Sequence, residues 1–182
     1  RDGIKGEADS PLLRAWNPMP EAEDFNSDDW VYNQYASANG HGNARGIARL
    51  FGGLANGGVI GGKRLLSEDL IADATREHWD DLDRMTNRPF RFGCGFMLSC
   101  PPFPFGGHRA NFGHTGIGGA IGFGDPARKI GFSYCGNRMA PIADTGPFAG
   151  PLIEALCLSE KGAGGVRLGG GNGGGLWSQA AV

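Results

Sequence analysis

The sequence has neither a long apolar run nor an excess of charge of one sign. Its 182 residues carry 17 Lys and Arg against 19 Asp and Glu, for a formal net charge of −2. This balance does not favour nucleic acid or an anionic membrane as a partner. No apolar run approaches the roughly 20 residues that a membrane-spanning helix needs. We therefore predict no nucleic-acid partner and no membrane partner.

The N-terminus lacks two further features. The first residues, Arg1 to Lys5, show no signal-peptide pattern, which favours a cytoplasmic location. The chain also does not begin with methionine, which suggests that it starts inside a longer gene product.

Cysteine is scarce and is not spaced as a disulfide framework. The four residues are Cys94, Cys100, Cys135 and Cys157. We expect buried free thiols, with Cys94 and Cys135 inside strands. A zinc site is one alternative, with Cys94, Cys100, His108 and His114 as ligands. Their C-x5-C and H-x5-H spacings differ from the C-x2–4-C of zinc fingers, so we predict no metal. The Gly-x-Gly patterns do not lead from a strand into a helix, so no dinucleotide cofactor is predicted either.

Glycine is abundant, with 34 residues, and its distribution helps to divide the chain into three parts. Residues 1–36 form an acidic lead-in with little periodicity, which we expect to be irregular. Residues 37–158 hold the periodic segments. Residues 159–182 form a glycine-rich tail that cannot bury enough area to offset its ordering entropy, so we expect it to be flexible.

Residues 111–138 predict a strand followed by a β-hairpin. Bulky and very small residues alternate in both hairpin arms, which is the period-2 pattern of strands. The bulky set is Ile121, Phe123, Ile130, Phe132 and Tyr134, and the small set includes Gly122, Gly124, Gly131 and Ser133. The intervening Asp125-Pro126 favours a type I turn, in which the Asp125 side chain can bond the turn backbone.

Two helices are predicted before this hairpin. Asn43 caps a helix over residues 44–56, which Gly57 and Gly58 end. Its apolar stripe is Ile47, Leu50, Phe51 and Leu54. Ser67 caps a second helix that we extend to Trp79, with the stripe Leu70, Ile71, Ala74 and His78. The acidic residues that follow, Asp80, Asp81 and Asp83, lack the glycine pivot and distal Glu of a calcium loop, so we interpret them as a solvated loop.

One strand and one last helix complete the predicted elements. Residues 90–98 alternate as a single strand, with Phe92, Cys94, Phe96 and Leu98 on one face. Pro147 begins a helix that runs to residue 158, with the apolar face Ala149, Leu152, Ile153 and Leu156. We expect this helix to lie on the small-residue side of the hairpin. Together the elements predict an α+β fold, an antiparallel sheet flanked by helices.

Two segments carry a family resemblance. The first is residues 37–58, SANGHGNARGIARLFGGLANGG. The second is residues 92–139, which contain a FG-x-GF strand, FGHTG, and a G-x-x-GFGDP hairpin ending in GNRM. Both segments resemble those of serine β-lactamase-like hydrolases. That group includes class C β-lactamases, penicillin-binding proteins and family VIII carboxylesterases. The esterase-like branch fits best, because His114 stands where β-lactamases have the Lys of KTG. The resemblance, over roughly residues 35–158, implies a partial β-lactamase-like fold.

The resemblance also implies a mechanism and a set of site residues. A serine in S-x-x-K attacks an ester or lactam carbonyl, and its lysine and a tyrosine of Y-x-N or Y-x-S move the proton. Carried over by position, His114 would lie beside these groups, and the backbone N–H of Ile117 would be one oxyanion donor. Thr115, Gly116 and Gly118 would line the substrate site. The glycines suit this role on physical grounds too, because a substrate can approach a backbone that has no side chain.

The groups that attack are missing from this sequence. None of its serines has Lys three residues later, and there is no Y-x-N. Tyr35-Ala36-Ser37 matches Y-x-S, but it directly abuts the SANG segment, so we interpret it as coincidence. We therefore predict an incomplete serine hydrolase that acts on short-chain esters or β-lactams. A complementing N-terminal segment or a dimer would be its partner. The alternative is a non-catalytic β-lactamase-like remnant or binding module.

Overall fold

The computed structural model describes residues 11, 14, 24–35, 38–101, 104–139 and 146–159. The predicted tail therefore lies outside the described residues except for Ser159, as does most of the acidic lead-in. In the lead-in, a 3-10 turn, η1 (Asp24–Asn26), precedes a short helix, α2 (Asp28–Tyr32). Trp30 of α2 stacks on Tyr35 with a centroid separation of 5.0 Å, whereas Tyr32 is 81% exposed.

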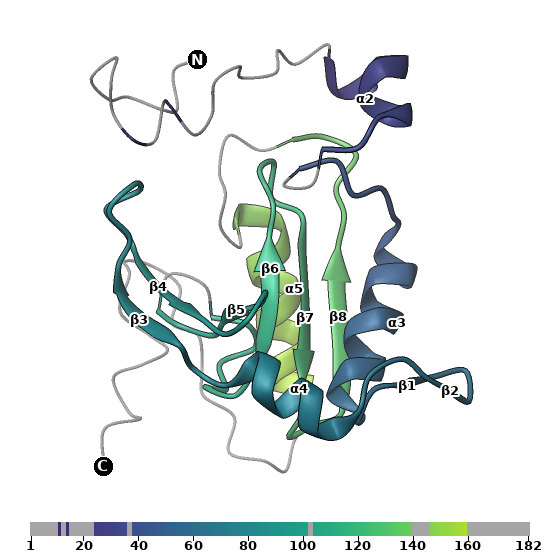
Figure 1. The fold of residues 1–182 in the computed structure, drawn as a ribbon, viewed down its shortest axis with the longest axis vertical. Coiled ribbons are helices and arrows are strands. Elements are labelled where there is room, and N and C mark those ends of the chain that lie inside the picture. Colours follow the sequence, from purple (N-terminus) through teal and green to yellow (C-terminus); the bar gives the residue numbers. More distant parts are fainter. Residues whose placement is uncertain are drawn as a thin grey trace.

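A six-stranded antiparallel sheet forms the centre of the fold (Figure 1). Its strands follow one another in space as they do in sequence. They are β3 (Trp79–Leu82), β4 (Pro89–Phe92), β5 (Met97–Leu98), β6 (Phe112–Thr115), β7 (Ile121–Asp125) and β8 (Ile130–Tyr134). The fold also has three longer helices, α3 (Ala44–Ala55), α4 (Glu68–Thr75) and α5 (Gly146–Ser159). A two-stranded hairpin, β1 (Val59–Ile60) and β2 (Lys63–Arg64), follows α3. The α+β prediction is confirmed.

The predicted hairpin is present as β7 and β8. Ile121 pairs with Tyr134, and Asp125 pairs with Ile130 at the other end. In the turn, the Oδ1 of Asp125 accepts a hydrogen bond from the N–H of Arg128 at 3.0 Å. The side chain of Asp125 is thus tied to the turn backbone, as the sequence predicts.

The two faces of the hairpin receive different helices. On the bulky face, Ile121 and Phe123 join Ala149 and Ile153 of α5 in one buried cluster, and Figure 1 shows α5 running behind β6 and β7. On the small face lies α3: a Cβ added to Gly131 would stand 2.1 Å from the carbonyl oxygen of Ala48. The prediction that the last helix packs on the small-residue face is therefore wrong. Ala149, Ile153 and Cys157 of α5 are buried on the bulky face, whereas α3 offers small residues that permit close contact with the glycine face.

Helix α3 begins and ends as predicted. The side chain of Asn43 accepts from the N–H of Gly46 at 2.9 Å, and Gly57 and Gly58 follow the helix with φ values of 81° and 83°. The predicted stripe is wrong at one position, because Leu50 is 43% exposed. Ala48 and the glycines, rather than Leu50, make the closest contact with the sheet.

Helix α4 is shorter than predicted. Ser67 caps it as expected, accepting from the N–H of Leu70 at 3.2 Å, but it ends at Thr75, and Trp79 begins β3. The predicted stripe fails at Leu70, which is 50% exposed, and at His78, which is exposed. The acidic run is not a loop, because Asp80 and Asp81 pair with Arg91 and Phe90 in β4.

The predicted strand over residues 90–98 is two strands joined by a turn. Phe92 of β4 pairs with Met97 of β5, and Cys94 lies exposed in the turn between them. The backbone of this turn packs on the end of α4, since the N–H of Cys94 donates to the carbonyl of Ala74 at 2.8 Å. Cys94 is therefore neither buried nor in a strand, contrary to the prediction. Cys100 and Cys157 are buried free thiols, whereas Cys135 is half-buried and follows β8.

Candidate active site

The five predicted site residues lie at the end of β6 and in the turn that leads to β7. His114 and Thr115 are the last residues of β6, and Gly116, Ile117 and Gly118 follow. Two hydrogen bonds close the turn. The N–H of Gly116 donates to Ala120 at 2.7 Å, and the N–H of Gly119 donates to Gly116 at 3.2 Å.

His114 presents an exposed imidazole from the α3 side of the sheet. It pairs with Gly122, whose missing side chain would point at Ile47 and Phe51 of α3. The Nδ1 atom lies 2.6 Å from the carbonyl oxygen of Thr115. A carbonyl oxygen only accepts hydrogen bonds, so Nδ1 carries the proton, and Nε2 of the neutral ring is an acceptor. The bond to a backbone carbonyl is typical of a structural histidine, but His114 is an exposed residue.

Thr115 lies on the opposite face of β6 from His114, because successive side chains of a strand alternate. It is half-buried, and its hydroxyl lies 3.9 Å from the sulfur of Met97 in the main core cluster. Strand β6 thus presents His114 on one face while Thr115 ties the same strand to the core.

Ile117 lies in the turn between Gly116 and Gly118. Its side chain is 44% exposed, and no described residue accepts a hydrogen bond from its N–H. Gly118 follows with φ at +93°, a conformation that side chains disfavour. An N–H for which the described residues offer no acceptor is chemically suited to bind a carbonyl oxygen or an oxyanion.

A buried polar pair joins the start of β6 to the end of β7. The side-chain amide of Asn111 donates to Asp125 Oδ2 at 2.9 Å and to the carbonyl of Phe105 at 2.6 Å. Both side chains are buried, at 0% and 1% exposure. Arg128 also pairs with Asp125 at 3.3 Å. Because buried polar groups are costly to leave unpaired, these bonds fix the position of β6 relative to β7.

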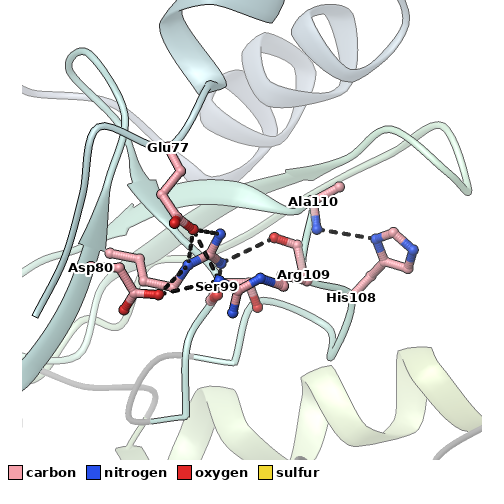
Figure 2. Close-up of polar contacts among 7 residues, drawn as sticks. Glu77, Asp80, Ser99, His108, Arg109 and Ala110 are labelled. Atoms are coloured by element: carbon pink, nitrogen blue, oxygen red, sulfur yellow. Dashed lines mark hydrogen bonds and ion pairs between the residues drawn. The ribbon is translucent and has the colours of Figure 1, made fainter. Parts of the chain in front are cut away.

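A charged cluster braces the loop that precedes β6, and sequence reasoning missed it. Arg91 is 5% exposed; it donates to Glu77 Oε2 at 2.8 Å and to the backbone carbonyls of Ser99 and Arg109. Figure 2 shows Glu77, Asp80 and Arg109 gathered at one place, where the Arg109 guanidinium lies 3.0 Å from Glu77 and 3.2 Å from Asp80.

The cluster changes the titration of one of its members. The hydrogen bond from Arg91 holds the pKa of the Glu77 carboxyl below its usual value, against the smaller opposing effect of burial. In the sequence, Arg91 stands between two phenylalanines of an alternating segment, a position typical of a solvent-facing side chain. No signal there could have marked it as buried.

The zinc alternative finds no support in the described part of the chain. Among those residues, no group of three or more His, Cys, Asp or Glu side chains is placed to hold a metal ion. No helix within the described ranges is long and apolar enough to cross a membrane.

A cavity of about 430 Å³ lies away from the predicted site, at the other end of β7. Its lining comes from α3, α4, the start of β6 and the β7–β8 turn and includes Leu54, Ile71, Phe112, Glu68 and Lys129. None of the five predicted site residues lines it.

The chain belongs to the beta-lactamase family. The sequence profile of that family, described as Beta-lactamase, matches residues 2–148. The match begins upstream of residue 35, where the resemblance first appears in the sequence motifs, and it ends inside α5.

The individual relatives include esterases and a penicillin-binding protein homologue. The esterase/beta-lactamase LipL of Mycobacterium tuberculosis (strain ATCC 25618 / H37Rv) is 39% identical over 111 residues, which is 60% of this chain and 25% of LipL. A penicillin-binding protein homologue from Caulobacter crescentus matches with a TM-score of 0.75 and 34% identity, over 85% of this chain and 41% of the homologue. A family VIII carboxylesterase matches with a TM-score of 0.73 and 37% identity, over 79% of this chain and 39% of the esterase.

Each of these matches covers only part of the related protein. The chain spans a quarter of the curated relative and about two fifths of each of the two solved structures. The family membership and the partial β-lactamase-like fold that the sequence motifs predict are confirmed.

Proposed function

We propose that residues 37–158 form the C-terminal part of an acyl-transfer site that cleaves short-chain esters or β-lactams. The observation that supports this most is the segment His114–Gly118, which joins an exposed histidine to a glycine-rich turn whose Ile117 N–H has no acceptor among the described residues. The likeness to a family VIII carboxylesterase at 37% identity favours the esterase chemistry.

In the proposed reaction, a serine hydroxyl attacks the acyl carbon and the ester C–O or lactam C–N bond breaks, which leaves an acyl-enzyme that water hydrolyses. The N–H of Ile117 donates to the oxyanion, together with the N–H of the serine itself. In the neutral tautomer with the proton on Nδ1, Nε2 of His114 can accept a hydrogen bond from the serine or tyrosine hydroxyl. Gly116 and Gly118 line the substrate site together with the backbone of Thr115, whose side chain lies on the opposite face of β6 from His114. The serine, lysine and tyrosine come from a complementing N-terminal segment or a partner chain.

The test compares this chain alone with a fusion. The fusion places the N-terminal part of the family VIII carboxylesterase, up to the point where the structural match begins, before the first matched residue of this chain. Hydrolysis of p-nitrophenyl acetate and of nitrocefin is followed for both proteins. We expect no turnover by the chain alone and turnover by the fusion. Replacing the S-x-x-K serine of the fusion by alanine must abolish that turnover.

Two variants of the fusion test the oxyanion donor directly. Ile117→Pro removes the N–H, and Ile117→Ala keeps it while removing most of the side chain. Loss of one oxyanion donor typically costs about 10²- to 10³-fold in kcat. We expect this loss in Ile117→Pro and less than about tenfold in Ile117→Ala. Equal rates in the two variants would contradict the role of this N–H.

The absence of S-x-x-K and Y-x-N from the sequence favours a second candidate, a non-catalytic remnant or binding module. A correctly folded fusion without turnover would support it. Turnover by the chain alone that is lost in Tyr35→Phe or Ser37→Ala would instead show that this chain carries its own nucleophile.

A further inference from the structure

The side chain of Met139 lies against the backbone of Gly118. A Cβ added to Gly118 would stand 3.0 Å from Cγ, 3.1 Å from Cβ and 3.1 Å from Cε of Met139. Three atoms of one side chain therefore surround the same point on the turn. Because Met139 comes five residues after the end of β8, the segment that leaves the sheet returns to the turn between β6 and β7.

Among the described residues, only two backbone hydrogen bonds donated by the turn hold its shape. Its own bonds are those of the Gly116 and Gly119 N–H groups, and four of its residues, from Gly116 to Gly119, include three glycines. Glycine loses more conformational freedom on ordering than any other residue. An unbranched, adaptable thioether that fills the space over Gly118 is a suitable device to limit that freedom.

Met139 is also accessible from outside. Its side chain is 52% exposed, and that of Ile117 is 44% exposed. The two apolar side chains thus contribute exposed surface on and beside the turn that carries the Ile117 N–H. A ligand whose carbonyl binds this N–H would place its adjoining alkyl group near that surface, where burial of each CH₂ is favourable.

We propose that Met139 is a positioning and specificity residue: it holds the turn of residues 116–119 in place and forms an apolar wall for the alkyl part of a short-chain acyl group. The specificity part rests on the proposed function above. The positioning part concerns the turn alone and holds whether or not the chain takes part in hydrolysis.

Amide hydrogen exchange of this chain, measured by NMR, tests the positioning part without any assay of activity. In Met139→Ala we expect the N–H of Gly119 to exchange at least about tenfold faster, because its bond to Gly116 opens more often. Met139→Leu fills the same space and is expected to restore the rate to within about twofold. Met85→Ala is the matched control, since Met85 is 40% exposed and precedes β4. Exchange in Met139→Ala equal to that of the unmodified chain would overturn the proposal.

The carboxylesterase fusion tests the specificity part. We expect Met139→Ala to lower kcat for p-nitrophenyl acetate about tenfold through misplacement of the oxyanion donor. We also expect it to raise KM for the butyrate ester more than for the acetate ester, and Met139→Leu to rescue both. Unchanged KM ratios in an active Met139→Ala fusion would overturn the specificity part. The two experiments can also give different answers. If the parent fusion is inactive while the Gly119 N–H exchanges faster in Met139→Ala of the chain alone, the hydrolase function is refuted and the positioning role is supported.

Discussion

The close contact between α3 and β8 makes Gly131→Ala a sharp test of this fold. In the structure, the added methyl carbon would stand 2.1 Å from the carbonyl oxygen of Ala48, 2.2 Å from the N and 2.5 Å from the Cα of Gly52. All three atoms belong to the backbone of one helix, so no side-chain rotation can relieve the overlap. The whole of α3 would have to move away from the sheet by about 1 Å to restore ordinary contact distances.

The expected cost follows from comparison with two other glycines. Overpacking typically costs 1–3 kcal/mol, and the rigid neighbours place Gly131→Ala at about 3 kcal/mol or more. At Gly122 the nearest atoms are Cγ2 of Ile47 at 2.6 Å and Cε2 of Phe51 at 2.8 Å. These side chains can shift, so we expect about 1–2 kcal/mol there. No atom of the described residues lies within 4 Å of a Cβ added to Gly40, and alanine should be neutral or stabilise by up to about 0.5 kcal/mol through the unfolded state.

Urea unfolding followed by circular dichroism measures these differences in the free energy of unfolding. For a chain of this size, a loss of about 3 kcal/mol corresponds to a fall in Tm of roughly 6–12 °C. From the most to the least stable variant, the order must be Gly40→Ala, Gly122→Ala and Gly131→Ala. If Gly131→Ala unfolds at the same urea concentration as Gly40→Ala, α3 does not pack on this face and the account of the fold fails.

Three further predictions concern capping and the charged cluster, and the same unfolding assay checks them. Arg91→Ala should lower the free energy of unfolding by about 2–3 kcal/mol, because two backbone carbonyls lose a charged donor. The control Arg76→Ala breaks an exposed ion pair and should lower it by less than about 0.5 kcal/mol. Equal losses in the two variants would contradict a bracing role for Arg91. The lowered pKa of Glu77 stabilises the fold at pH values above the usual glutamate pKa of about 4.3. This stabilisation is lost as the pH falls through the folded-state pKa. Glu77→Gln should therefore reduce the fall in the free energy of unfolding at acid pH. Asn43→Ala should cost about 1 kcal/mol through loss of the helix cap, and an unchanged midpoint would show that this cap is dispensable.

Local rules were sufficient for elements whose signals lie within a few residues. The capping residues Asn43 and Ser67 act on amides three positions away, and Asp125 bonds the N–H of its own turn. The alternation around Phe123 and Phe132 predicts the hairpin because side chains in a strand alternate whatever packs on them. The family motifs are likewise contiguous, so the family and the α+β class could be predicted from the sequence.

Tertiary packing decided which surfaces meet, and the sequence alone could not show it. The glycine face of the hairpin accepts any helix that approaches closely, and the choice of α3 over α5 depends on the backbone contact between Gly52 and Gly131. The break of residues 90–98 into two strands follows from the packing of Cys94 against Ala74 in α4. Arg91 is buried because distant carboxylates and carbonyls meet its guanidinium, and such compensation is invisible to local periodicity.

The segment His114–Gly118 shows what the local sequence determines and what tertiary packing determines. The sequence by itself determined that an imidazole stands next to a glycine-rich turn, since the residues are adjacent in the chain. The structure decided that the ring donates to the carbonyl of Thr115 and that Met139, twenty-one residues after Gly118, lies over the turn. The physical reason is that an antiparallel sheet brings the end of β8 back beside the start of β7, so the contacts that shape the turn come from chain that is remote in sequence.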